Sequence, residues 1–321
     1  MRSGFIGLAG VVAGVACACV GAPEAHSQPA SDPRDPRSPL SQIGDVRAHG
    51  ADPPASAAPT RLPASRQAAL SLEEAAAGPW RIDPARDRWR HPVETLRFFR
   101  IRPDMTIVEA WPGGGWYTAI LAPYLKSGGG RLYAAHFDAA SARPSAVRVT
   151  EAFRKAFVED PSRYGDITLS VLSRTRQDIA PDASVDAVLT FRNVHNWMAQ
   201  GYADDVFRSF YRVLKPGGLL GIEEHRLPPG REQDPKAGSG YVAEDYVIRL
   251  AADAGFELIA RSQINANPRD MADHPFGVWT LPPTLRSSPL GRPPDPTFDH
   301  APYLAIGESD RMTLLFRKPA G

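Results

Sequence analysis

Three side chains with acid–base chemistry stand at the ends of two apolar runs. His195 comes shortly after the run 185–191, and Glu224 and His225 follow the run 219–223. If both runs are neighbouring parallel strands, their carboxyl ends meet at one edge of a sheet, where such sheets place their ligands. An imidazole there can accept a proton near neutral pH. We therefore expect a catalytic base among His195, Glu224 and His225.

The same trio offers two imidazoles and one carboxylate, which transition metals accept as ligands. The residues lack the dense spacing of metal-binding motifs, and a hydrogen bond between a carboxylate and an imidazole explains their pairing equally well. We expect no metal at this site, and a metal held by the trio is the alternative.

A glycine-rich turn, Trp111-Pro-Gly-Gly-Gly115, joins the apolar run 107–110 to a run that can form a helix. Glycines allow positive φ and close approach of a ligand, and the start of a helix offers free N–H groups. This order predicts a nucleotide-type site. The dinucleotide pattern G-x-G-x-x-G needs a small third residue, but Thr118 stands there, which disfavours diphosphate binding.

The spacing of Glu109, Gly113 and Gly115 resembles motif I of the class I S-adenosylmethionine-dependent methyltransferases, E/D-x-G-x-G-x-G, with Trp111 in place of the first glycine. The turn Leu214-Lys-Pro-Gly-Gly218 is also similar to one that recurs before the fifth strand in that superfamily. The resemblance implies S-adenosylmethionine as the cofactor. It implies a binding site for the cofactor's amino-acid end made by Glu109, Trp111, Gly113 and Gly115.

Two further acids are expected to hold the cofactor. Asp138 ends the run 131–137, and an acid in that place accepts hydrogen bonds from ribose hydroxyls in many nucleoside-binding α/β folds. His136 is an alternative contact, and a helix cap is the competing interpretation of Asp138. The resemblance implies that Asp178, in the loop after the third strand, touches the adenine, although a loop cap explains this residue equally well.

The resemblance also implies that the cofactor and the acceptor meet after the fourth strand. Asn193 lies there beside His195 and would position the acceptor. Tyr117 and Trp279 are predicted to line the same acceptor pocket. The segment before the first strand adds three candidates, which otherwise form a solvated helix face: Arg86, Arg90 and His91.

Residues 1–27 have the layout of a secretory signal peptide, with Arg2 before the apolar, small-residue run 4–20. The run is short for a membrane span, so membrane contact is expected only through an uncleaved or lipidated leader. Cys17 and Cys19 are the only cysteines. Removal of the leader would therefore exclude disulfides, a cysteine nucleophile and zinc–thiolate sites.

Residues 28–68 are rich in Pro, Ala, Ser and Arg without apolar periodicity, which predicts a disordered tether. Residues 69–321 are expected to form one domain, in which 265–309 is a lid-like insertion. The resemblance covers about 83–319 and implies a Rossmann-like α/β fold. Its seven-stranded sheet would be mostly parallel with an antiparallel last strand, and helices would cover both faces.

The chain carries 37 Lys and Arg against 36 Asp and Glu and has no basic block, so nucleic acid is not an expected partner. More narrowly, the phrases Trp-Pro-Gly-Gly-Gly-Trp-Tyr-Thr and Gly-Val-Trp-Thr-Leu-Pro-Pro are similar to those of a bacterial group of predicted methyltransferases with leader peptides.

The resulting hypothesis is methyl transfer from S-adenosylmethionine to a small-molecule acceptor by an exported, periplasmic protein. A cytosolic metabolite has no obvious route to an exported enzyme. An exported, non-catalytic small-ligand-binding protein with the same fold is therefore the main alternative. A nicotinamide-dependent oxidoreductase is the weaker one. If the leader is not used, the protein is cytoplasmic, and N-terminal sequencing of the mature protein decides this point.

Overall fold

The structure, a computed structural model, describes residues 68–138, 140 and 144–321. The expected signal peptide at 1–27 and the expected tether at 28–68, apart from its last residue, lie outside the described residues. Within the described part of the chain, no helix has the length and apolar character needed to cross a membrane.

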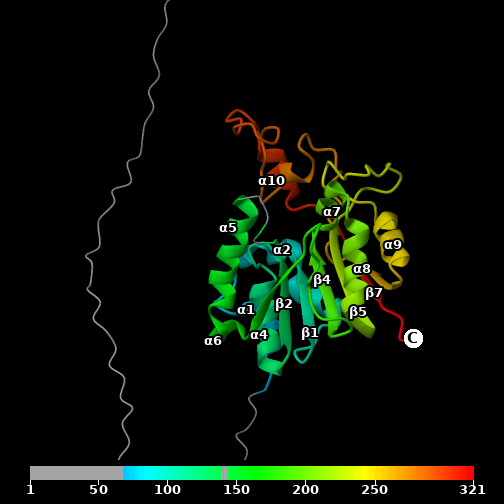
Figure 1. Ribbon diagram of the computed structural model, residues 1–321. Coiled ribbons are helices and arrows are strands. Elements are labelled where there is room, and N and C mark those ends of the chain that lie inside the picture. Colours follow the sequence, from blue (N-terminus) through cyan, green and yellow to red (C-terminus); the bar gives the residue numbers. More distant parts are fainter. Residues whose placement is uncertain (1–67, 139, 141–143) are drawn as a thin grey trace, which may run out of the picture. The chain divides into compact units, whose positions relative to one another are not determined.

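One sheet of seven strands forms the centre of the domain (Figure 1). The strands are β1 (Thr106–Ala110), β2 (Arg131–His136), β3 (Ile167–Val171), β4 (Val185–Phe191), β5 (Leu214–His225), β6 (Glu257–Ser262) and β7 (Arg311–Arg317). Their order is β3-β2-β1-β4-β5-β7-β6. β7 is antiparallel to both of its neighbours, and the other neighbouring pairs are parallel. The predicted fold class is therefore confirmed.

Helices cover both faces of the sheet, as expected. Successive residues of a strand point to opposite faces, so Val108 and Ile107 of β1 belong to different apolar clusters. Because the central strands are covered on both sides, their sequences are almost continuously apolar. The first face packs against α7 (Val194–Gln200), α8 (Ala203–Val213) and α9 (Glu244–Asp253), and the second against α1 (Leu72–Ala77), α3 (Pro92–Phe98), α4 (Thr118–Gly128), α5 (Pro144–Phe153) and α6 (Pro161–Tyr164).

Some boundaries differ from those that the sequence suggests. The apolar pattern predicts a helix at 149–157, but α5 already begins at Pro144, a residue that suits a first helical turn, and continues as a π-helical turn over Arg154–Val158. Lys215 to Gly218 reads as a turn, but β5 begins at Leu214, which pairs with Val185 before a shift in register.

Two segments that do not connect successive parallel strands bring side chains to the carboxyl ends of the strands. One precedes β1, and the other is the segment 265–309. Arg86 and Arg90 of the first segment form ion pairs with Glu308 of the second. Besides α1 and α3, the described parts of these two segments contain the short helices η1 (Pro84–Arg86), α2 (Asp87–Arg90), η3 (Gly277–Thr280) and α10 (Ala301–Ile306).

Candidate functional site

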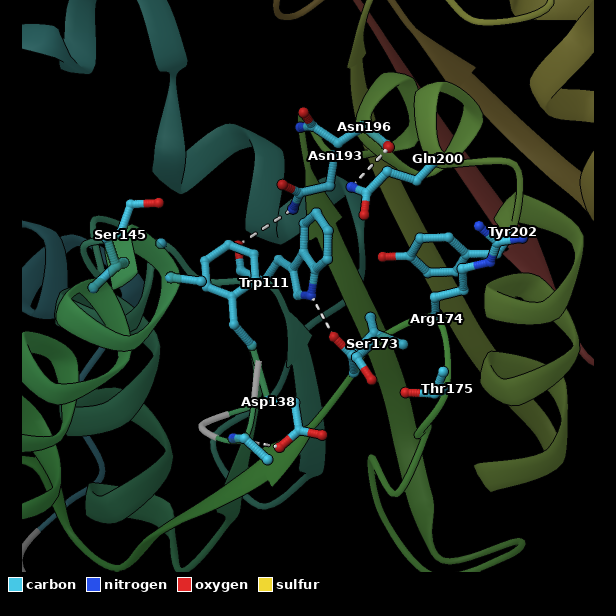
Figure 2. A pocket seen from close by; sticks show the side chains of 16 residues that line it. Trp111, Asp138, Ser145, Ser173, Arg174, Thr175, Asn193, Asn196, Gln200 and Tyr202 are labelled. Atoms are coloured by element: carbon cyan, nitrogen blue, oxygen red, sulfur yellow. Dashed lines mark hydrogen bonds between the residues drawn. The ribbon is translucent and has the colours of Figure 1, made fainter. Parts of the chain in front are cut away.

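Two adjoining cavities lie at the carboxyl ends of the central strands. Cavity A has a volume of about 560 Å³, and its walls include Trp111, Phe137, Asp138, Leu172 and Asn193 (Figure 2). Cavity B has a volume of about 530 Å³, and its walls include Arg86, Arg90, Arg192, His195, His225 and Trp279. Both volumes fall in the range of about 300–1,000 Å³ that small-molecule sites occupy. Trp111, Gly113, Asn193 and Asn196 line both cavities.

The glycine turn between β1 and α4 opens onto both cavities through Gly113. This residue has a φ of +59°, and a Cβ added to it would meet no atom within 4 Å. Gly115 has a different role, because an added Cβ would lie 2.2 Å from the Phe157 ring. Gly115 therefore lets α5's π-helical extension pack against the turn, and it lines neither cavity.

Glu109 supports this turn from inside the fold. It is buried, and the hydroxyl of Thr118 donates a hydrogen bond of 2.6 Å to its Oε2 atom. Burial raises the pKa of Glu109 to about 7, although Thr118 opposes the shift. Glu109 lines neither cavity. In place of the predicted ligand contact, Glu109 links β1 to α4 through its hydrogen bond with Thr118. The same bond explains why a threonine stands at position 118.

Trp111 places its indole along one wall of cavity A (Figure 2). The indole Nε1–H donates to the carbonyl of Leu172 at 2.7 Å, and the ring lies 4.6 Å from that of Phe137. Leu172 follows β3, and β2 lies between β1 and β3 in the sheet. The indole therefore extends across the end of β2 and forms a flat apolar surface there.

Asp138 lines cavity A, as predicted for the ribose contact. Its Oδ1 atom accepts a hydrogen bond from the Ala140 N–H at 3.0 Å, and its Oδ2 atom has no hydrogen bond to any described residue. Because α5 begins only at Pro144, Asp138 is not the N-cap of that helix. No described residue therefore competes with a ligand for this oxygen.

The alternative contact, His136, is not part of this wall. Its Nδ1 atom accepts from the Phe137 N–H at 2.9 Å, so its Nε2–H faces the Gly113 carbonyl at 3.2 Å. Burial lowers the pKa of His136 despite this bond. The neutral imidazole thus ties the end of β2 to the glycine turn.

Asp178, the predicted adenine contact, does not line cavity A. Asp178 is exposed and paired with Arg176 at 2.7 Å, because its loop folds back beside β3 and its carbonyl accepts from the Val171 N–H. Ser173, Arg174 and Thr175 line cavity A in its place.

Tyr117, which was predicted to line the acceptor pocket, does not line either cavity. Its ring is buried and stacked on Phe191 at 3.6 Å, and its hydroxyl lies 3.1 Å from Glu223 Oε2. Asn193 and Trp279, the other predicted acceptor contacts, do line cavity B.

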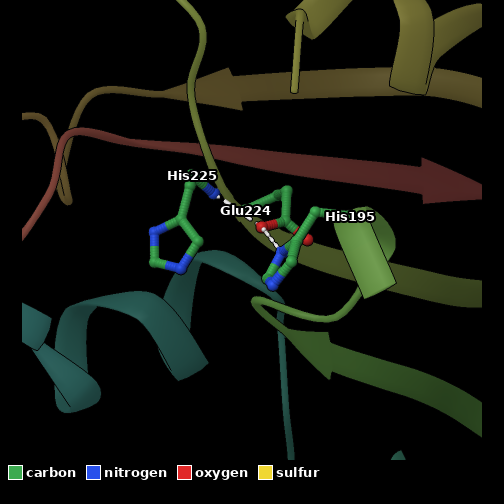
Figure 3. A group of neighbouring side chains, drawn as sticks. All are labelled: His195, Glu224 and His225. Atoms are coloured by element: carbon green, nitrogen blue, oxygen red, sulfur yellow. Dashed lines mark hydrogen bonds and ion pairs between the residues drawn. The ribbon is translucent and has the colours of Figure 1, made fainter. Parts of the chain in front are cut away.

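His195, Glu224 and His225 converge as the sequence suggests (Figure 3). Glu224 is fully buried and accepts from the Val194 N–H at 2.5 Å, the His225 N–H at 2.8 Å and His195 Nδ1 at 2.9 Å. The ligand atoms of the trio lie within 4.8 Å of one another. Since Glu224 already accepts three hydrogen bonds, it acts mainly as the partner that orients His195.

The two imidazoles differ in what they can do. His195 donates its Nδ1–H to Glu224, which leaves Nε2 as an acceptor on a residue that lines cavity B. His225 Nδ1 lies 2.6 Å from the Ser309 hydroxyl. Burial, then the nearby His195 and arginines, hold the pKa of His225 well below its usual value. His225 is therefore a neutral wall residue, and His195 is the better placed base.

Arginines dominate the other side of cavity B. Arg86 Nε and Arg90 Nε lie 2.6 and 3.0 Å from the carboxylate of Glu308, and Arg192 Nη1 lies 2.9 Å from Glu223. Arg90 is only 5% exposed, so the solvated-face interpretation is wrong for this residue. His91, from the same segment, lines neither cavity.

The sequence gives no role to Arg192 or Glu308, although both line cavity B. Arg192 directly follows β4, so its position at a strand end was a usable signal. Glu308 has no such signal, because the segment 265–309 brings it to the site.

Comparison with known proteins gives one domain match and a shared fold. A family model described as a methyltransferase domain matches residues 112–222. No curated protein matches the sequence. Among solved structures, the cyclase SpnF is 15% identical with a TM-score of 0.50, and the match covers 76% of this chain and 86% of that one. This likeness concerns the fold alone.

Two further matches have lower TM-scores. For a SAM dependent methyltransferase from Aquifex aeolicus the score is 0.45 at 20% identity, over 57% of this chain and 88% of that one. For the N-methyltransferase NodS from Bradyrhizobium japonicum WM9 it is 0.44 at 15% identity, over 74% of this chain and 98% of that one.

Proposed function

We propose that the chain is a class I S-adenosylmethionine-dependent methyltransferase and that it methylates a small-molecule acceptor bound in cavity B. The observation that supports this proposal is the shared wall between the cavities, to which Trp111, Gly113 and Asn193 contribute. Group transfer requires that donor and acceptor be held side by side. Cavity A would hold the cofactor and cavity B the acceptor.

The residues of cavity A suit S-adenosylmethionine. The Oδ2 atom of Asp138, which accepts no hydrogen bond from a described residue, can accept one from a ribose hydroxyl. The rings of Trp111 and Phe137 offer apolar surface to a purine, and the space above Gly113 is open. When bound, the cofactor supplies an electrophilic methyl group.

His195 is proposed to remove the proton from the acceptor's nucleophile. The hydrogen bond from Nδ1 to Glu224 fixes the imidazole ring and leaves Nε2 as the atom that takes the proton. Trp279, Pro282 and Pro283 also line cavity B, and their apolar surfaces would limit the access of water.

Cofactor binding is tested by titrating the full chain with S-adenosylmethionine and S-adenosylhomocysteine in a calorimeter. We expect micromolar binding that Asp138→Ala weakens by about 10- to 100-fold, because a hydrogen bond to a charged group contributes about 1.5–3 kcal/mol. Asp178→Ala is the matched control and should bind like the parent protein. Failure of the folded parent to bind either compound would contradict the proposal.

The role of His195 is tested with labelled S-adenosylmethionine and an acceptor found by screening small phenols, amines, thiols and carboxylates. His195→Asn should lower kcat by about 10²- to 10⁴-fold, the usual contribution of a general base, without changing affinity for S-adenosylhomocysteine. His91→Asn is the control, since Asn tolerates the positive φ of His91 and this residue lines neither cavity. Equal rates for both variants would exclude His195 as the base.

A further inference from the structure

Cavity B is bordered by more positive than negative buried charge. Arg86, Arg90, Arg192 and Arg311 form one ion-pair network with Glu223 and Glu308. The fully buried Glu224, paired with His195, is a third carboxylate beside the cavity. Four guanidinium groups against three carboxylates leave an excess of one positive charge. Asp83 also borders the cavity, but its side chain is 56% exposed and approaches Arg86 only at 4.0 Å, so water screens most of its charge.

The arginines that line this cavity also have N–H groups without acceptors. Among the described residues, the Arg90 side chain donates only through Nε, to Glu308, and the Arg192 side chain donates only through Nη1, to Glu223. Arg86 likewise uses only Nε, and its Nη2 atom is buried without a partner. A guanidinium group has five N–H donors, and buried donors are normally paired.

Arg90 has the most buried side chain of the arginines that line cavity B. Its side chain is 6% exposed and borders cavity B, and its guanidinium lies over the Trp116 ring at 4.7 Å, which holds its plane. Burial, then the charge of Arg192, lower the pKa of Arg90 to about 9.

A bound cation is the opposite interpretation of the same cavity. His195 and His225 both line the cavity and, with Glu224, form a group whose ligand atoms lie within 4.8 Å of one another. A divalent cation there would be repelled by the excess charge of the arginine network. An anion would be attracted by that charge and would provide the missing acceptors.

We propose that cavity B contains an oxyanion subsite and that the methyl acceptor carries a carboxylate or phosphate group on an apolar body. This inference rests on the proposed function, which it extends to the chemical class of the acceptor. Carboxylate and phosphate oxygens both match the planar fork of a guanidinium. Trp116, Phe191 and Trp279 provide the apolar and aromatic walls for the rest of the molecule.

The test uses fluorine NMR on the full chain with three probes of nearly equal shape. They are para-fluorobenzoate, para-fluorophenyl phosphate and the neutral para-fluorobenzamide. At least one anion should bind on the order of tenfold more tightly than the amide, and its affinity should fall as salt is added. The stronger of the two anions identifies the oxyanion. If the amide binds as tightly as both anions, the subsite proposal is overturned.

Variants locate the binding. Arg86→Gln should weaken the anion by on the order of tenfold, whereas Arg86→Lys, which keeps the charge, should retain most of the affinity. Arg88→Gln is the matched control, because Arg88 lies in the neighbouring helix α2 but does not line cavity B. An equal loss for Arg88→Gln would overturn the assignment. The comparison of probes on the parent protein remains decisive if Arg86→Gln does not fold.

Titration with S-adenosylhomocysteine in the same samples separates the two proposals. Binding of this compound without binding of either anion overturns the subsite and leaves the proposed function standing. Binding of an anion without binding of this compound supports the subsite and contradicts the proposed function. Binding of zinc ions alone, with no anion bound, would favour the cation site and overturn the inference.

Discussion

Replacing Gly113 by leucine is expected to weaken S-adenosylhomocysteine binding by on the order of 100-fold while the domain stays folded. The Gly113 backbone has a φ of +59°, and its hypothetical Cβ points into open space that borders both cavities. A leucine there would occupy ligand volume, and overfilling a packed site costs about 1–3 kcal/mol. Calorimetry measures the loss of affinity, and thermal unfolding measures the stability.

Gly129→Leu is the matched control for this experiment. Gly129 ends α4 with a φ of +82°, its added Cβ would also meet no atom within 4 Å, and it lines neither cavity. Both variants should lose a similar 1–2 kcal/mol, roughly, from the strained backbone. If Gly113→Leu binds like the parent protein, the glycine turn does not border the cofactor site.

Replacing Glu223 by glutamine is expected to cause the largest loss of stability, about 3–5 kcal/mol. Glu223 is fully buried, and its Oε1 atom lies 2.9 Å from Arg192 Nη1 and 3.1 Å from Arg311 Nη1. A neutral side chain would leave the buried Arg311 charge poorly compensated. For a domain of this size the midpoint of thermal unfolding should fall by on the order of 10 °C.

The exposed pair of Glu257 and Arg317 provides the control for Glu223→Gln. Both of its side chains are about half exposed, so Glu257→Gln should change stability by no more than about 1 kcal/mol. Burial raises the pKa of Glu223, but Arg311 and Arg192 outweigh it and hold that pKa below the usual value. The ion pairs therefore contribute fully at neutral pH and less on acidification. Equal losses for the two variants would show that the buried network is not a major source of stability.

The sheet could be predicted because its determinants are local. Nearly continuous apolar runs mark β1 and β4, and the glycine turn fixes the step from β1 to α4. Once the strand order is known, His195 and Glu224 must approach each other, since they follow or end neighbouring parallel strands.

Other parts of the site depend on how loops fold. Asp138 and Asp178 are both acids after strands, but only the loop after β3 turns back, and this takes Asp178 away from cavity A. Tyr117 was predictable as an aromatic near the turn but not as a buried ring stacked on Phe191. The pairing of Arg86 with Glu308 spans 222 residues, and no local pattern indicates such a contact.

Because Arg86 pairs with a residue so far along the chain, the two cavities do not receive all their lining residues at the same stage of ribosomal synthesis. All residues that line cavity A lie between Trp111 and Tyr202. Cavity B also needs Glu308 and Ser309, which come much later in the chain. Since chains are made from the N-terminus, the residues that line cavity A exist well before those that complete cavity B. A product that terminates before β7 would keep every cavity A residue but could not form the full arginine network, because Arg311 would be missing.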